Sequence, residues 1–185
     1  MKKRTNKKTI KLLLIILISA FAGCAESEEE SIYIPPETSV VDKQFNFHVV
    51  DKGVWRSSQP NPESIGRMKS HGLKSILNLR GDSSTDEWER RIADSLGIDY
   101  FNYPMDATQI QDSVYISKIL AVISDSSNQP ILVHCLGGKD RTGLMIGLYK
   151  KEILKLPLDE IEEEMIMYGH DADNYPEVIN ALREY

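Results

Sequence analysis

The ten residues from His134 to Gly143, HCLGGKDRTG, constrain this chain more than any other stretch. The apolar run 130–133 before them is rich in β-branched residues, which is typical of a strand buried on both faces. The run 144–149 after them is apolar nearly all round, as expected of a buried helix. The stretch therefore predicts a strand–loop–helix unit. Its loop directs backbone N–H groups and the positive end of a helix dipole towards a bound anion.

The side chains of this loop suit the chemistry of a phosphate ester. Cys135 attacks only as a thiolate, and a helix N-terminus or a nearby cation lowers the pKa of a thiol from its free value of ~8.5. Arg141 follows six positions later, and its planar guanidinium can bind two phosphate oxygens at once. Gly137 and Gly138 let the backbone approach the phosphate without an intervening Cβ. These residues predict a nucleophile held in a phosphate cradle.

Other residues of the loop have supporting roles in this interpretation. The Thr142 hydroxyl can reach back to stabilise the thiolate when it leaves, and His134 can orient the loop through its ring nitrogens. Lys139 adds a second cation at the mouth of the site. The predicted phosphate-binding residues are Leu136, Gly137, Gly138, Lys139, Asp140 and Arg141.

The motif His-Cys-x5-Arg-Thr-Gly resembles the active-site motif of the cysteine-dependent protein tyrosine phosphatase superfamily. Upstream, VWRSSQP at 54–60 and LKSILNLR at 73–80 look like compact, atypical dual-specificity phosphatases of bacteria, fungi and plants. The resemblance covers residues 45 to 170. It implies a single-domain α/β fold, with a mainly parallel sheet flanked by helices on both faces. It also implies hydrolysis of phosphoproteins or inositol phosphates through a phosphocysteine, with no metal or other cofactor.

Such a reaction needs an acid to protonate the leaving group, usually a carboxylic acid on a mobile loop. Asp106 follows a predicted strand, enters a polar loop and lies 29 positions before Cys135, a separation similar to that in the family. We therefore expect Asp106 to be the catalytic acid. Asp140 is the alternative, because GKDR resembles a subgroup of bacterial phosphatases proposed to lack the usual acid loop. Otherwise Asp140 would anchor the loop backbone.

Two functions from other classes stay open at this point. A rhodanese-like sulfur-transfer enzyme also places a cysteine in a loop of amides, but it requires neither an upstream acid nor the Arg-Thr-Gly ending. A non-catalytic phosphate-binding module would not need both Cys135 and Arg141. The group of His170 with Asp171 and Asp173 is too loose to predict a metal site.

The N-terminus resembles an export signal. Six basic residues precede an uncharged, mainly apolar stretch at 12–22, which is too short to span a bilayer but suits a signal peptide. It ends in FAGC at 21–24, similar to a bacterial lipobox whose cysteine is acylated. We expect residues 1–23 to be a lipoprotein signal peptide and Cys24 to be lipidated. The protein would then be anchored to the bacterial cell envelope, at the outer membrane or cell surface rather than the inner membrane.

The charge of the chain argues against a nucleic-acid partner. Loss of the leader lowers the basic residues from 22 to 16 against 28 acidic ones, which changes the net charge from −6 to −12. No basic patch is left to bind a nucleic acid backbone. The acidic, Pro-containing segment 24–40 is predicted to be a disordered tether, and residues 41–185 to form one catalytic domain.

The rest of the chain alternates between strand and helix patterns, which favours an α/β sheet. We expect strands at 45–50, 53–56, 75–79 and 98–103, and around Ile131. Helices are expected from Pro62 to Gly72, from a capping box at 84–87 to Gly97, and from Asp112 to Ser124. The helix after the loop at 134–143 is expected to end at Leu154, and two more helices are expected over 159–168 and from Pro176. The run Glu162–Glu164 is predicted to be a solvated helix face.

Overall fold

The computed structural model describes residues 45–185, so the predicted signal peptide, tether and lipidated Cys24 lie outside the described part of the chain. Strands and helices alternate, as the sequence predicts. The strands are β1 His48–Val49, β2 Val54–Ser57, β3 Ser75–Asn78, β4 Asp99–Asn102 and β5 Ile131–His134. The helices are α1 Pro62–Ser70, α2 Ser83–Leu96, α3 Ser113–Ser124, α4 Asp140–Glu152, α5 Leu158–Met167 and α6 Pro176–Glu184.

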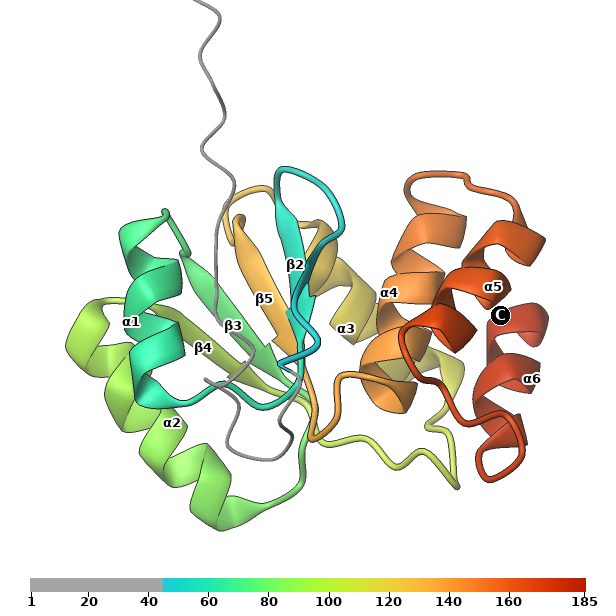
Figure 1. Ribbon diagram of the computed structural model, residues 1–185, viewed down its shortest axis with the longest axis horizontal. Helices are drawn as coiled ribbons and strands as arrows, with labels where there is room; N and C mark the ends of the chain where they lie inside the picture. The colour runs from blue at the N-terminus through green and yellow to red at the C-terminus, as the bar shows by residue number, and fades with distance from the viewer. Residues whose placement is uncertain (1–44) are drawn as a thin grey trace, which may run out of the picture. The chain divides into compact units, whose positions relative to one another are not determined.

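The strands form one sheet in the order β1-β2-β5-β3-β4, in which β1 is antiparallel and the other four are parallel. The last strand in the chain, β5, therefore lies between β2 and β3 (Figure 1). In register, Ser57 and Asn78 both pair with His134. The loop that follows β5 thus leaves the centre of the carboxyl edge of the sheet, where open α/β sheets bind their ligands.

Helices cover both faces of the sheet, as predicted. Helices α1 and α2 lie on one face, and α3 to α6 lie on the other (Figure 1). Side chains of β5 alternate between the two cores, as expected for a strand. Ile131 and Val133 belong to the core under α3–α6, whereas Leu132 packs with Trp55 and Ile76 in the core under α1 and α2.

The helices begin where polar side chains satisfy their free N–H groups. Asn61 accepts from Ser64 N at α1, and Asp112 accepts from Tyr115 N at α3, both as predicted. The predicted capping box at 84–87 is wrong, because α2 begins at Ser83 with Asp82 as its N-cap. The Asp82 carboxylate accepts from two backbone N–H groups of the first turn, and Glu87 pairs instead with Arg91.

Other element boundaries also differ from the sequence prediction, among them those of the first strand and of helix α4. The first strand is limited to His48–Val49, because Asn46 has a left-handed backbone with φ of 49° that interrupts an extended segment. Helix α4 ends at Glu152 instead of Leu154. Within residues 45–185, none of the helices combines the length and the apolar character that crossing a bilayer requires.

Candidate active site

The predicted loop joins the carboxyl end of β5 to the N-terminus of α4 (Figure 1). Cys135 is the first residue after the strand, and its side chain is buried among the core residues below α4. Asp140 and Arg141 form the first turn of α4. The strand–loop–helix prediction is confirmed, and the free N–H groups of α4 lie at the same end of the helix as Cys135, the predicted nucleophile.

The scaffold holds the carbonyl groups of the loop on one side. Gln59 N donates to Leu136 O at 3.0 Å. Asn46 Nδ2 donates to Gly137 O at 3.1 Å and to Gly138 O at 3.3 Å. In a trans peptide the N–H of one residue points away from the carbonyl of the residue before it. The N–H groups of residues 137, 138 and 139 therefore point away from these scaffold contacts, as the predicted phosphate-binding role of the loop requires.

Gly138 is required by both the conformation and the space of the loop. Its φ is +67°, and a Cβ at this position would lie 2.6 Å from the carbonyl group of Ser57 and from Ser58 N. These neighbours are backbone atoms, which cannot rotate away. At Gly137, by contrast, a Cβ would meet only carbons of the Lys139 side chain, starting at 3.5 Å. The two glycines of the motif are thus not equivalent.

Arg56 is a buried cation beneath the loop, with 1% of its surface exposed. Its Nη2 donates to Gly138 O at 2.7 Å, and its guanidinium lies 4.9 Å from the centre of the Tyr168 ring. Burial lowers the pKa of Arg56, while its electrostatic interaction with Glu164 acts in the opposite direction. The position of Arg56 shows that it supports the loop from below.

The prediction of a solvated face at Glu162–Glu164 holds for Glu163, which is exposed, but is wrong for Glu162 and Glu164. Glu164 Oε1 lies 3.9 Å from Arg56 Nη1, and Glu164 Oε2 accepts from Lys150 Nζ. Glu162 forms two hydrogen bonds to Arg183, at 2.6 and 2.7 Å. Glu162 and Glu164 have partners because α5 packs against α4 and because Glu162 reaches Arg183 of α6, which periodicity alone does not reveal.

His134 lies under the loop with its ring fully buried. Its Nδ1 is 3.3 Å from the carbonyl oxygen of Cys135, and its Nε2 is 3.1 Å from Oε1 of the buried Glu89. This position agrees with the predicted role of orienting the loop. The Thr142 hydroxyl is buried without a hydrogen-bond partner among the described residues, so its contact with the Cys135 sulfur stays a prediction.

Asp140 is held by the segment that joins α5 and α6. Its Oδ1 lies 2.8 Å from His170 Nδ1 and accepts from Asp171 N at 3.2 Å. Gly169, with φ of +90°, sits against the aliphatic part of the Lys139 side chain. These contacts match the anchoring role considered for Asp140. Among residues 45–185, no three His, Cys, Asp or Glu side chains are grouped so as to hold a metal ion.

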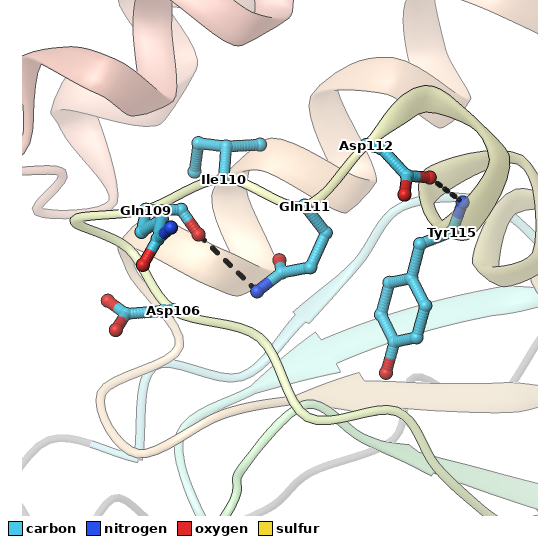
Figure 2. Close-up of a pocket in the computed structure, with 6 residues that line it drawn as sticks. All are labelled: Asp106, Gln109, Ile110, Gln111, Asp112 and Tyr115. Carbon is cyan, nitrogen blue, oxygen red and sulfur yellow. Dashed lines mark hydrogen bonds between the residues drawn. The ribbon is translucent and has the colours of Figure 1, made fainter.

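Asp106 lies on the loop between β4 and α3, at the edge of an open cavity of about 340 Å³ (Figure 2). The other residues that line this cavity are Gln109, Ile110, Gln111, Asp112 and Tyr115. The backbone N–H of Thr108 and then its hydroxyl donate to Asp106 Oδ1 and lower the pKa of Asp106. The charge of Arg141, the smallest of these effects, also lowers it. Arg141 belongs to the predicted phosphate-binding residues 136–141, called the phosphate loop below.

Three residues at the site were not predicted as part of it. Asn46 joins the loop to Tyr168 O at 3.1 Å, and nothing in the sequence marks it. His170 contacts the loop across 30 positions. Glu89 shares a buried face of α2 with Thr85 and Ala93. The spacing of four residues indicates this face, but a carboxylate on a helix is normally expected to be exposed to solvent.

Most of the chain matches one known protein family. Residues 41–179 match the family described as the tyrosine phosphatase family. The chain belongs to this family. Inositol diphosphatase DSP4 of Arabidopsis thaliana is 35% identical over 125 residues, which cover 65% of this chain and 58% of that protein. The dual specificity protein phosphatase TpbA of Pseudomonas aeruginosa is 22% identical over 144 residues, which cover 76% and 64%.

Solved structures confirm the α/β fold. The core catalytic domain of the PP-IP phosphatase SIW14 from S. cerevisiae superposes with a TM-score of 0.67 at 28% identity, covering 76% of this chain and 85% of that one. P. aeruginosa TpbA superposes with a TM-score of 0.65 at 21% identity, covering 80% and 89%. Against the full proteins, the chain spans little more than half the length of the first curated relatives.

Proposed function

We propose that the chain is a cysteine-dependent phosphatase that hydrolyses phosphate monoesters. One observation carries this proposal: Gln59, Asn46 and Arg56 donate hydrogen bonds to the loop carbonyl groups and hold them against the scaffold. It leaves the loop N–H groups to surround an anion next to Cys135, at the N-terminus of α4. This arrangement stabilises a thiolate and a phosphoryl group alike.

The residues divide the reaction into two steps. The Cys135 sulfur attacks phosphorus and the bond to the leaving oxygen breaks, while Arg141 and the loop amides bind the equatorial oxygens. Asp106 donates its proton to the leaving oxygen. Water, deprotonated by the same carboxylate, then attacks the phosphocysteine and releases phosphate and the thiolate. The engagement of Asp140 with His170 favours Asp106 over Asp140 as the acid.

The substrate class is proposed from the relatives and from the charge of the site. Several relatives are named inositol diphosphatases, and SIW14 is named a PP-IP phosphatase. Lys139, adjacent to the first turn of α4, adds a cation that suits a highly charged phosphate. We therefore expect inositol polyphosphates, or inositol pyrophosphates cleaved at their anhydride bond, to be better substrates than phosphotyrosine. Phosphotyrosine is the alternative substrate, because TpbA is named a dual specificity protein phosphatase.

A phosphate-release screen of the full-length chain tests this function. Aryl phosphates, phosphopeptides and inositol phosphates are compared for the parent and for Cys135→Ser. The parent should release phosphate and be inhibited by vanadate, which mimics the five-coordinate phosphorus. The serine variant should be inactive but should still bind substrate, because the cradle is unchanged.

Three results would contradict the proposal. Phosphate release by the serine variant would exclude Cys135 as the nucleophile. Transfer of sulfur from thiosulfate to cyanide, without ester hydrolysis, would favour the rhodanese-like alternative. Binding without turnover by the parent would favour a phosphate-binding module.

For the location, we propose that the chain is exported and anchored to the cell envelope through acylated Cys24. The support lies in the basic start, the short apolar stretch and the lipobox-like sequence at 21–24. The acidic segment that follows would place the catalytic domain at a distance from the membrane. Soluble organic phosphates outside the cytoplasm would then be the accessible substrates.

A further inference from the structure

A buried carboxylate lies behind the phosphate loop and has no part in the mechanism above. Glu89 of α2 is 0% exposed. Its Oε1 accepts from Gln59 Nε2 at 2.9 Å, and its Oε2 accepts from Asn78 Nδ2 at 2.9 Å and from the Tyr100 hydroxyl at 3.1 Å. Oε1 also lies 3.1 Å from His134 Nε2. These donors give both oxygens of the buried Glu89 side chain hydrogen-bond partners, as a buried polar group requires.

These contacts connect Glu89 to several strands at one edge of the sheet. Asn78 ends β3 and His134 ends β5, directly beside it in register. Tyr100 belongs to β4, and Gln59 follows β2. A single carboxyl group thus joins the carboxyl ends of β3 and β5 to Tyr100 of β4 and to Gln59 after β2, at the position from which the phosphate loop begins.

The two ring nitrogens of His134 both face acceptors. Nε2 faces the Glu89 carboxylate, and Nδ1 faces the carbonyl oxygen of Cys135 at 3.3 Å. The Nε2 contact is a close approach that is not aligned as a hydrogen bond, whereas Nδ1 donates to the backbone carbonyl of Cys135.

We propose that Glu89 is a positioning residue that acts through His134. Its carboxyl group, 3.1 Å from Nε2, fixes the imidazole ring, and the ring holds the backbone carbonyl of Cys135. This keeps the sulfur at the N-terminus of α4, where a thiolate is favoured. The consequence for catalysis rests on the proposed function, but the consequence for thiol reactivity does not.

The experiment measures the rate at which iodoacetamide alkylates Cys135 as a function of pH. The full-length chain is used, and the site is read by peptide mass spectrometry because Cys24 is also present. Glu89→Gln should move the midpoint of the profile to higher pH and slow alkylation at neutral pH about tenfold, the effect of raising a thiol pKa by one unit. The kcat should fall in parallel.

Two further variants show whether Glu89 acts through His134. His134→Asn should shift the profile in the same direction, and the double variant should react no more slowly than His134→Asn alone. Tyr100→Phe is the matched control, because it removes one donor from Oε2 but keeps the carboxylate charge. It should lower the melting temperature without moving the profile.

The proposal is overturned if folded Glu89→Gln keeps the parent midpoint, or if the effects of Glu89→Gln and His134→Asn multiply in the double variant. If Glu89→Gln does not fold, His134→Asn decides alone, and an unmoved midpoint there overturns the proposal. A parent chain that releases no phosphate would refute the proposed function but would leave the alkylation result interpretable.

Discussion

Replacing Gly138 by alanine should damage both stability and catalysis. A non-glycine residue at φ of +67° costs about 1–2 kcal/mol, and forcing a methyl group against the backbone costs about 1–3 kcal/mol more. The free energy of unfolding should therefore fall by about 2–5 kcal/mol. At about 2–4 °C per kcal/mol for a domain of this size, the melting temperature should drop by about 4–20 °C.

The loss of activity follows from the displacement that the new Cβ requires. The Cβ would lie 2.6 Å from atoms of Ser57 and Ser58, whereas ordinary contacts begin at 3.4 Å, so the loop must move by about 0.8 Å. A misplacement of about 1 Å in an active site costs about 10²-fold in rate. We expect Gly138→Ala to lower kcat/KM for p-nitrophenyl phosphate by about that factor.

Two other glycines provide the comparison. Gly66→Ala places its Cβ in open space on helix α1, so it should stabilise the domain by up to about 1 kcal/mol. Gly137→Ala meets a flexible lysine side chain and should cost much less than Gly138→Ala. Thermal melts and phosphate release on the same preparations test this order. A Gly138→Ala protein within threefold of the parent in kcat/KM, with an unchanged melting temperature, would refute the reasoning.

The remaining predictions concern the acid, its pH dependence, the loop support and the anchor. Asp106→Asn should slow the hydrolysis of alkyl phosphates by about 10²–10⁴-fold and that of p-nitrophenyl phosphate less. Asp140→Asn should raise KM and lower the rate for all leaving groups alike; the reverse pattern in steady-state kinetics would assign the acid to Asp140. Thr108→Val removes a hydroxyl that lowers the pKa of Asp106, so the alkaline fall of kcat/KM for alkyl phosphates, which follows loss of the acid proton, should move to higher pH; an unmoved limb would contradict this. Arg56→Met loses a buried charged hydrogen bond to Gly138, worth about 1.5–3 kcal/mol. The free energy of unfolding, measured by denaturant titration, should fall by that amount. Cys24→Ser should abolish fatty-acid labelling in a bacterial host, and persistent labelling would exclude lipidation at Cys24.

The sequence predicted the α/β fold and the strand–loop–helix unit because these depend on local patterns. The apolar run before His134 and the apolar helix after Arg141 need only hydrophobic periodicity to be recognised. The helix starts at Pro62 and Ser113 were likewise predictable, because Asn61 and Asp112 are strong capping residues next to them. Where two capping residues compete within a few positions, as Asp82 and Ser84 do, local pattern alone gave the wrong cap.

Only the tertiary structure decided what supports the phosphate loop. Asn46, Arg56 and Glu89 reach the loop or its histidine from positions 45 to 92 residues away, and no spacing in the chain encodes such contacts. Their polar groups are brought together because β5 is inserted between β2 and β3. The chemistry of Cys135 and Arg141 is thus local in the sequence. The fixation of the loop that lets them act is set by strand order, which is a property of the folded sheet.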